Sequence, residues 1–170
     1  EPIENLITCL NFKIDRVVYF GHDDIMTPEA EGLIRKHLRR LCNVTDVEFI
    51  PVSRRNLQRI LEVLENSIKM QMNQNSRCFF DLTGGEDLIL VAMGILSTRY
   101  QTPMHHFEIE TGELILVNKY EVPSITEVVP ERQIRLTLDD IIGFHGGIID
   151  YNQQKYLIET RCSGALTVPY

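Results

Sequence analysis

The sequence predicts an α/β fold with a mostly parallel, doubly wound sheet and a C-terminal β-hairpin. Short apolar runs bounded by turn residues alternate with amphipathic stretches of helical length over residues 3–118. This alternation is typical of right-handed βαβ units, in which helices cover both faces of a parallel sheet. A Gly-Gly turn also stands where one apolar run meets a helix, at the strand end where open α/β sheets bind ligands.

The first predicted elements are a helix, a strand and a second helix. The opening helix is indicated by apolar residues at helical spacing, namely Ile3, Leu6, Ile7 and Leu10. A strand over 17–20 ends at Gly21, and Thr27 with Pro28 then marks a helix start. Because such a sheet normally has a strand ahead of its first helix, we expect the first strand to be missing from this sequence.

The later elements follow the same alternation. A helix after the Gly-Gly turn is apolar on nearly every side, which predicts burial in a core or against another subunit. The predicted ranges are strand 47–52, helix 57–68, strand 77–80, helix 86–100 and a hairpin of strands 104–109 and 113–118.

The pattern changes after Pro123, which divides the chain. We expect one α/β domain over 1–122, and a linker with the start of a further domain over 123–170. Residues 125–130 are linker-like, 143–147 form a glycine-rich break, and 155–170 have strand character without a core of their own.

Composition excludes some partners and compartments. A net charge of −7 argues against direct binding of long nucleic acid or an anionic membrane. No apolar run approaches the roughly 20 residues that cross a bilayer. The four cysteines lie far apart, without zinc-ligand spacing, so we expect reduced structural thiols, a cytoplasmic location, and neither a metal nor a cofactor.

The sharpest local signal is the run from Phe79 to Glu86. Glycines at 84 and 85 would let the backbone approach a ligand closely, while N–H groups at the helix start would face an anion. Thr83 would add a hydroxyl, and Asp81 would orient the loop or hold a water. The alternative is a tight turn with Thr83 as the helix cap, since the run is neither a Walker loop nor a G-x-G-x-x-G fingerprint.

The run Asp81-Leu82-Thr83-Gly84-Gly85, followed by an apolar helix, resembles the signature loop of CARF domains, the CRISPR-associated Rossmann-fold sensors. The element order from residue 3 to about 120 is similar to the subfamily fused to a restriction-like nuclease. This resemblance implies a Rossmann-like homodimer that binds cyclic oligoadenylate across its two-fold axis and regulates an attached effector in antiviral defence. It implicates Thr83, Gly84 and Gly85 in ligand contact, with Asp81 in support.

The helix start departs from that family. A small polar residue and a lysine commonly follow Thr-Gly-Gly, whereas Glu86 and Asp87 stand here and would repel a phosphate. Gly21 and His22 follow a strand that ends at the same edge, so they are included in the predicted ligand site, with a solvated turn as the alternative.

Other residues indicate weaker candidates. Asp81, Glu86 and Asp87 could instead hold Mg²⁺. His105 and His106 adjoin on a strand, so their rings should face opposite sides and should not share a metal.

Three functions therefore remain open. The first is a nucleotide second-messenger sensor, and the second is a metal-dependent phosphodiesterase that cleaves its ligand at the same loop. The third is a dimerisation domain with a degenerate site.

Overall fold

Helices and parallel strands alternate along the chain in the computed structural model, so the α/β class is confirmed. The structure describes residues 6, 8–10, 12–74, 76–108, 113–117, 137–139, 142, 157–160 and 164–167. Leu6 and residues 8–10 are helical and buried, as predicted for the opening helix, of which Ile3 and Ile7 lie outside the described residues. The elements are β1 (Arg16–Gly21), α2 (Pro28–His37), the π-helical turn η1 (Leu38–Cys42), β2 (Asp46–Pro51), α3 (Leu57–Asn73), β3 (Phe80–Asp81), α4 (Asp87–Tyr100), β4 (Met104–Glu108), β5 (Glu113–Leu116), β6 (Leu157–Thr160) and β7 (Gly164–Thr167).

The start of α2 follows from its sequence. The Thr27 hydroxyl accepts a hydrogen bond from the backbone N–H of Ala30 at 3.3 Å, and Pro28 occupies the first helical position. Threonine satisfies one of the free N–H groups of the first turn, while proline lacks an N–H that would need a partner. The predicted cap is therefore confirmed.

The described strands pair in three groups, β1 with β2, β3 with β4 and β5, and β6 with β7. Strands β1 and β2 pair in parallel, from Arg16 opposite Asp46 to Gly21 opposite Pro51. Strand β3 pairs in parallel with β4, which pairs antiparallel with β5, and β6 pairs antiparallel with β7. The predicted hairpin after α4 is thus confirmed as β4–β5.

Strand β3 is shorter than predicted and contains two residues. Phe79, just before it, packs its ring against His105 at a centroid distance of 4.5 Å and against Phe12 at 6.0 Å. These contacts pack the Phe79 ring although Phe79 is not part of the paired strand. The apolar run in the sequence is therefore longer than β3.

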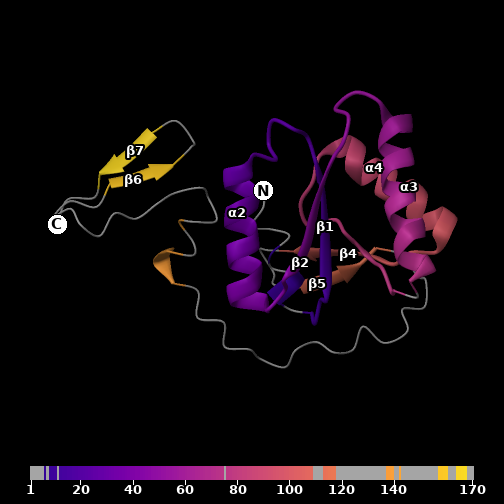
Figure 1. Cartoon of the computed structure of the whole chain (residues 1–170), viewed down its shortest axis with the longest axis horizontal. Helices are drawn as coiled ribbons and strands as arrows, with labels where there is room; N and C mark the ends of the chain where they lie inside the picture. Colours follow the sequence, from indigo (N-terminus) through magenta and orange to yellow (C-terminus); the bar gives the residue numbers. More distant parts are fainter. Residues whose placement is uncertain are drawn as a thin grey trace.

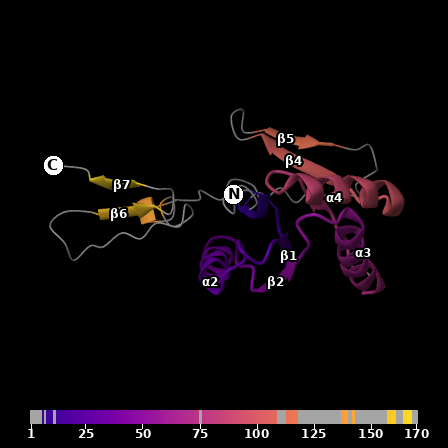
Figure 2. The same ribbon diagram turned by 90° about the horizontal axis from the view of Figure 1, so that it is seen from above.

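Two apolar clusters pack against β1, and the ribbons in Figures 1 and 2 show helices on both sides of β1 and β2. Val17 and Tyr19 pack on a cluster built by the opening helix, α2, η1 and β2, whereas Phe20 packs on one built by α3 and α4. Because successive strand residues point to opposite faces, helices cover β1 from both sides. Figure 1 shows α2 on one side of β1 and β2, with α3 and α4 on the other.

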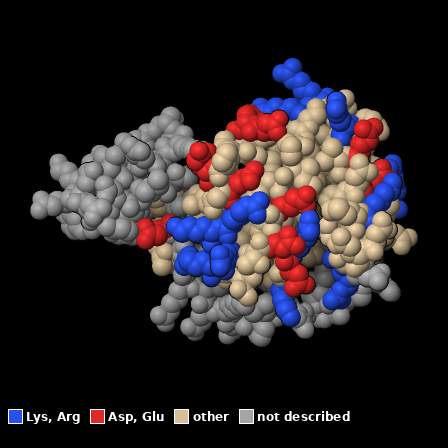
Figure 3. All heavy atoms as spheres, viewed as in Figure 1, with Lys and Arg blue, Asp and Glu red and all other residues tan. Residues whose placement is uncertain are grey.

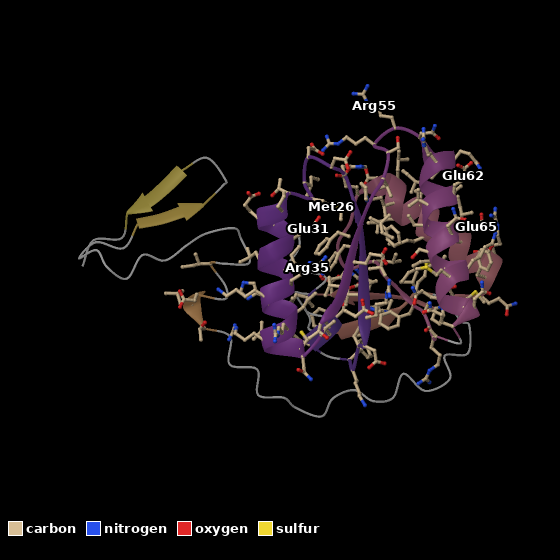
Figure 4. All side chains as sticks on the ribbon, in the orientation of Figure 1. Met26, Glu31, Arg35, Arg55, Glu62 and Glu65 are labelled. Carbon is tan, nitrogen blue, oxygen red and sulfur yellow. The ribbon has the colours of Figure 1, made fainter. Side chains whose placement is uncertain are left out.

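Helices α3 and α4 are also joined by polar contacts. Glu65, labelled in Figure 4, accepts hydrogen bonds from the Tyr100 hydroxyl and from Arg99 at 3.1 Å. These bonds lower the pKa of the Glu65 carboxyl, with that of Tyr100 contributing most. The middle of α3 is thereby tied to the C-terminal end of α4.

The cysteines match part of the expectation. Cys9 and Cys42 are buried thiols outside any disulfide, and Cys78 is half-buried. Burial raises the pKa of the Cys9 and Cys78 thiols, which favours the unreactive protonated form.

Much of the predicted C-terminal region lies outside the described residues. This holds for the boundary at 122/123, the linker over 125–130 and the glycine-rich break over 143–147. The strand character predicted over 155–170 is confirmed by β6 and β7. Within the described ranges, no helix has the length and apolar character needed to cross a membrane.

Core packing predicts unequal effects of two substitutions on α3. Leu64 is fully buried, so Leu64→Ala should lower the free energy of unfolding by about 2–5 kcal/mol. Met70 is 41% exposed, so Met70→Ala should change it by less than about 0.5 kcal/mol. Urea denaturation measures both, and equal losses would contradict the assigned core.

Candidate functional site

The segments that follow β1 and β2 meet the start of α4 around the side chain of His22. This residue directly follows β1, and its Nδ1 lies 3.0 Å from the carbonyl oxygen of Val52, directly after β2. Its Nε2 lies 2.7 Å from the Oε2 of Glu86, at the start of α4. The His22 side chain is 4% exposed and that of Glu86 43%, so the interpretation of His22 as part of a solvated turn is wrong.

Both partners of the His22 ring are oxygen atoms that can accept a hydrogen bond. The Val52 carbonyl can only accept, so Nδ1 donates to it. Nε2 faces a carboxylate oxygen, and that contact is a hydrogen bond only if one more proton lies on the ring or on Glu86. When Nε2 also carries a proton, it donates to Glu86 and the two groups form an ion pair.

The loop after β3 is built on the carboxylate of Asp81. Its Oδ1 accepts hydrogen bonds from the Thr83 N–H at 2.9 Å and from the Thr83 hydroxyl at 2.5 Å. The Thr83 hydroxyl oxygen in turn accepts from the N–H of Phe107, on β4, at 3.0 Å. Asp81 therefore orients the loop, as one of its predicted roles required, while the buried Thr83 hydroxyl is engaged within the protein.

The start of α4 differs from the cap that was considered for it. Glu86, and not Thr83, is the N-cap residue, and its side chain makes no hydrogen bond to the helix. The Glu86 carboxylate turns instead to His22. The first N–H groups of α4 consequently carry no side-chain acceptor, which leaves them available to an anion.

Only one glycine of the turn needs a backbone conformation that other residues avoid. Gly85 has φ +157°, whereas Gly84 is not among the described glycines with positive φ. A Cβ atom added at Gly85 would lie 3.0 Å from Cδ2 of Leu90. The close approach that requires glycine is therefore placed at Gly85.

The acidic residues near the site differ in their pairing. Glu86 faces His22, so its charge is balanced when the ring is protonated, whereas Asp87 is exposed. Asp24, in the turn after β1, forms an ion pair with Arg54 at 2.5 Å. The expected repulsion of a phosphate by two acids at the helix start is thus reduced to that of Asp87. Figure 3 shows charges of both signs interspersed on the face it displays.

Gly21 completes the same edge of β1. Its carbonyl oxygen accepts a hydrogen bond from the Val52 N–H at 2.9 Å. A Cβ atom at Gly21 would lie 2.9 Å from the sulfur of Met26, which is labelled in Figure 4. The absent side chain thus leaves room for Met26 beside the strand end.

Two buried polar groups accompany Asp81. The Nε2 of His105 lies 3.7 Å from Asp81 Oδ1, and burial lowers the pKa of His105 while Asp81 opposes that shift. The Tyr19 hydroxyl is buried without a hydrogen-bond partner among the described residues, and burial raises its pKa. His105 is buried while the His106 side chain is 36% exposed, as expected for neighbours on a strand.

The proposed magnesium ligands do not gather. Among the described residues, no group of three or more His, Cys, Asp or Glu side chains is placed to hold a metal ion. Asp81 is committed to Thr83, Glu86 to His22, and Asp87 is exposed.

Sequence reasoning missed two backbone groups of the site. The Val52 carbonyl orients His22, and the Phe107 N–H binds Thr83. The Val52 carbonyl could have been predicted, because Val52 ends a predicted strand at the same edge as Gly21. The Phe107 N–H could not be predicted, because its position beside the loop depends on how β4 lies against β3.

No protein-family model matches the sequence, and no curated protein matches it significantly. Two solved structures share its fold. Protein VC1899 from Vibrio cholerae has a TM-score of 0.70 at 15% identity, over 91% of this chain and 39% of that protein. Can2 from Sulfobacillus thermosulfidooxidans, solved in complex with cyclic tetra-adenylate, has a TM-score of 0.64 at 13% identity, over 87% of this chain and 39% of Can2.

The likeness to Can2 supports a CARF-like fold. It agrees with the resemblance noted from the run over 81–85, which lies at the carboxyl end of β3. The chain spans 39% of the length of each of the two proteins.

The loop predicts a test of the Thr83 hydroxyl. Thr83→Val keeps the shape but leaves the Phe107 N–H and Asp81 without that partner, so the free energy of unfolding should fall by about 1–3 kcal/mol. Thr83→Ser retains the hydroxyl and should lose less. Urea denaturation measures both variants, and equal stability of Thr83→Val and Thr83→Ser would contradict the anchoring role.

Proposed function

We propose that this chain contains a nucleotide-sensing domain that binds cyclic oligoadenylate at a homodimer interface and regulates an attached effector in CRISPR-type antiviral defence. The observation that carries the proposal is the shared fold with Can2, which was solved with cyclic tetra-adenylate. The loop after β3 supports it independently, because its backbone is anchored and the start of α4 is not capped by a side chain.

The same proposal treats the separate parallel pairs as parts of one doubly wound, Rossmann-like sheet. Helices cover both faces of β1, and the segments after β1 and β2 meet the start of α4 at His22. In the Rossmann strand order 3-2-1-4-5-6, the innermost strand precedes the first helix and would separate β1 from β3. No described strand pairs with both, which fits the expected first strand ahead of the opening helix.

In this site the backbone makes the principal ligand contacts. The N–H groups of Gly84, Gly85 and the first turn of α4 bind phosphate, and glycine at 85 allows the close approach. Asp81 and Thr83 hold the loop in position. Gly21 and His22 form the adjoining edge at the end of β1, while Glu86 and Asp87 set the charge next to the phosphate.

Helix α4 supplies the proposed dimer contact. Val91 and Ile95 lie one turn apart on this helix, and their exposed fractions are 49% and 38%. Both follow the helix start that forms the ligand site, so a two-fold axis beside α4 would bring two loops to one ligand. The apolar pair would be covered by its copy, as the prediction of burial against another subunit requires.

One experiment tests the proposed function against two alternatives. A metal-dependent phosphodiesterase would convert cyclic tetra-adenylate to linear products when Mg²⁺ or Mn²⁺ is added. A dimerisation domain with a degenerate site would neither bind nor cleave it. Calorimetry followed by chromatography of the nucleotide separates the three, and we expect binding without products.

Gly85→Val should lower the affinity for cyclic tetra-adenylate at least about tenfold. The β-branched side chain conflicts with φ +157°, meets Leu90 and blocks the approach of phosphate to the backbone. Isothermal calorimetry measures the affinity, and circular dichroism checks that the variant is folded.

The matched control for this variant is Gly32→Ala, because Gly32 lies on α2 with no atom within 4 Å of an added Cβ. It should leave the affinity unchanged. Wild-type affinity in a folded Gly85→Val protein would contradict the placement of the ligand at this turn.

The dimer should dissociate when a charge is placed on α4. Wild type should have the mass of two chains in light scattering, through an interface above about 1,000 Å². Val91→Glu should give a monomer, whereas Met70→Glu, an equivalent change of an exposed residue on α3, should not. A monomeric wild type at micromolar concentration would refute the shared site.

A further inference from the structure

The environment of His22 is unusual for a surface turn. The ring is almost fully buried, and each nitrogen faces an oxygen acceptor, the Val52 carbonyl at 3.0 Å and the Glu86 carboxylate at 2.7 Å. With Nδ1 committed to the carbonyl, Nε2 is the nitrogen that can change partners. A buried imidazolium is stable only beside an anion, so Nε2 requires a negatively charged acceptor.

Glu86 is a replaceable acceptor. Its side chain is 43% exposed, and it is the N-cap residue of α4 but makes no capping hydrogen bond. Among the side-chain hydrogen bonds within the described residues, rotation of this side chain into solvent would break only the one with His22. A phosphodiester carries the same single negative charge and accepts the same kind of hydrogen bond, so it can take the place of the carboxylate.

The other charged groups near His22 leave it as the available cation. Asp23 shares its turn and is exposed, and Asp87 adjoins Glu86 and is exposed. Arg54, in the segment after β2, is engaged by Asp24 at 2.5 Å, and Arg55 is exposed in the same segment. Of these groups, only the imidazolium of His22 is both buried at the strand ends and in contact with the start of α4.

We propose that His22 is the phosphate-binding cation of this site, and that Glu86 occupies its Nε2 until the ligand displaces it. The inference rests on the proposed function and explains how a helix start without a lysine binds an anion. Ligand binding exchanges one anionic partner of the ring for another, while Nδ1 stays on the Val52 carbonyl.

This exchange makes affinity depend on pH in one direction. At low pH the ring is protonated with either partner, so binding takes up no proton and affinity is level. Above the pH at which the ligand-free ring loses its proton, binding must restore that proton. Affinity then falls by up to about tenfold per pH unit for each histidine involved.

The experiment compares two measurements on the full chain. Calorimetry with cyclic tetra-adenylate gives affinity from about pH 5.5 to about pH 9, a range that spans ordinary histidine titration. NMR of the His22 ring in the ligand-free protein gives the pH at which it loses its proton. The affinity should begin to fall at that same pH.

Two variants test the roles of His22 and Glu86 separately. His22→Gln should weaken binding at low pH by about tenfold or more, the usual range for a charge-assisted hydrogen bond, and should abolish the pH dependence. Glu86→Gln should strengthen binding at low pH by about twofold to fivefold, as expected for removal of a partly exposed ion-pair partner.

Asp24→Asn is the matched charge control. It removes one negative charge from the same turn without touching His22, so it should leave both the titration and the pH profile unchanged. If His22→Gln does not fold, Glu86→Gln still tests the exchange.

The outcomes distinguish this inference from the proposed function. Binding that is independent of pH, or an affinity that Glu86→Gln does not raise, overturns the role of His22 while leaving the sensor function in place. Absence of binding by wild type and all variants at every pH refutes the sensor function itself.

Discussion

The hydrogen bonds of the His22 ring hold the strand ends of this fold together. A ring with acceptors on both nitrogens joins the turn after β1, the segment after β2 and the start of α4. These segments are about 30 and 64 residues from His22 along the chain, so no local preference brings them together. Because the ring is buried, its charge is stable only with Glu86 beside it, and the geometry of the site therefore depends on a partner that itself lies partly in solvent.

The loop after β3 is positioned in a different way. Asp81 binds both the N–H and the hydroxyl of Thr83, and Thr83 receives the N–H of Phe107 from β4. Loop and sheet are thus joined through side chains that the sequence suggested as ligand contacts. What faces outward is backbone, which suits an anion of variable shape better than a fixed side-chain donor does. The polar side chains of this motif hold the backbone in place.

Charge balance separates this helix start from the pattern that its family resemblance implies. Two consecutive acids appear repulsive in the sequence, yet Glu86 pairs with a histidine that lies 64 positions earlier. The remaining acid, Asp87, favours the positive end of the helix dipole while no ligand is bound. In the proposed site, a protonated His22 ring balances Glu86, so anion binding would exchange the partner of the ring instead of adding charge.

Local patterns in the sequence determined the α/β class, the Thr27 cap and the β4–β5 hairpin, because each depends on neighbouring residues whose preferences agree. They also placed Asp81, Gly85 and His22 at strand ends. Tertiary structure decided which of these residues contact one another: Glu86 with His22, and Thr83 with Phe107. It decided as well that the positive φ belongs to Gly85, and that β3 shrinks to two residues beside the packed ring of Phe79. The physical reason is that burial, and contacts between residues distant in the sequence, depend on how strands and helices pack. The spacing of residues along the sequence does not determine that packing.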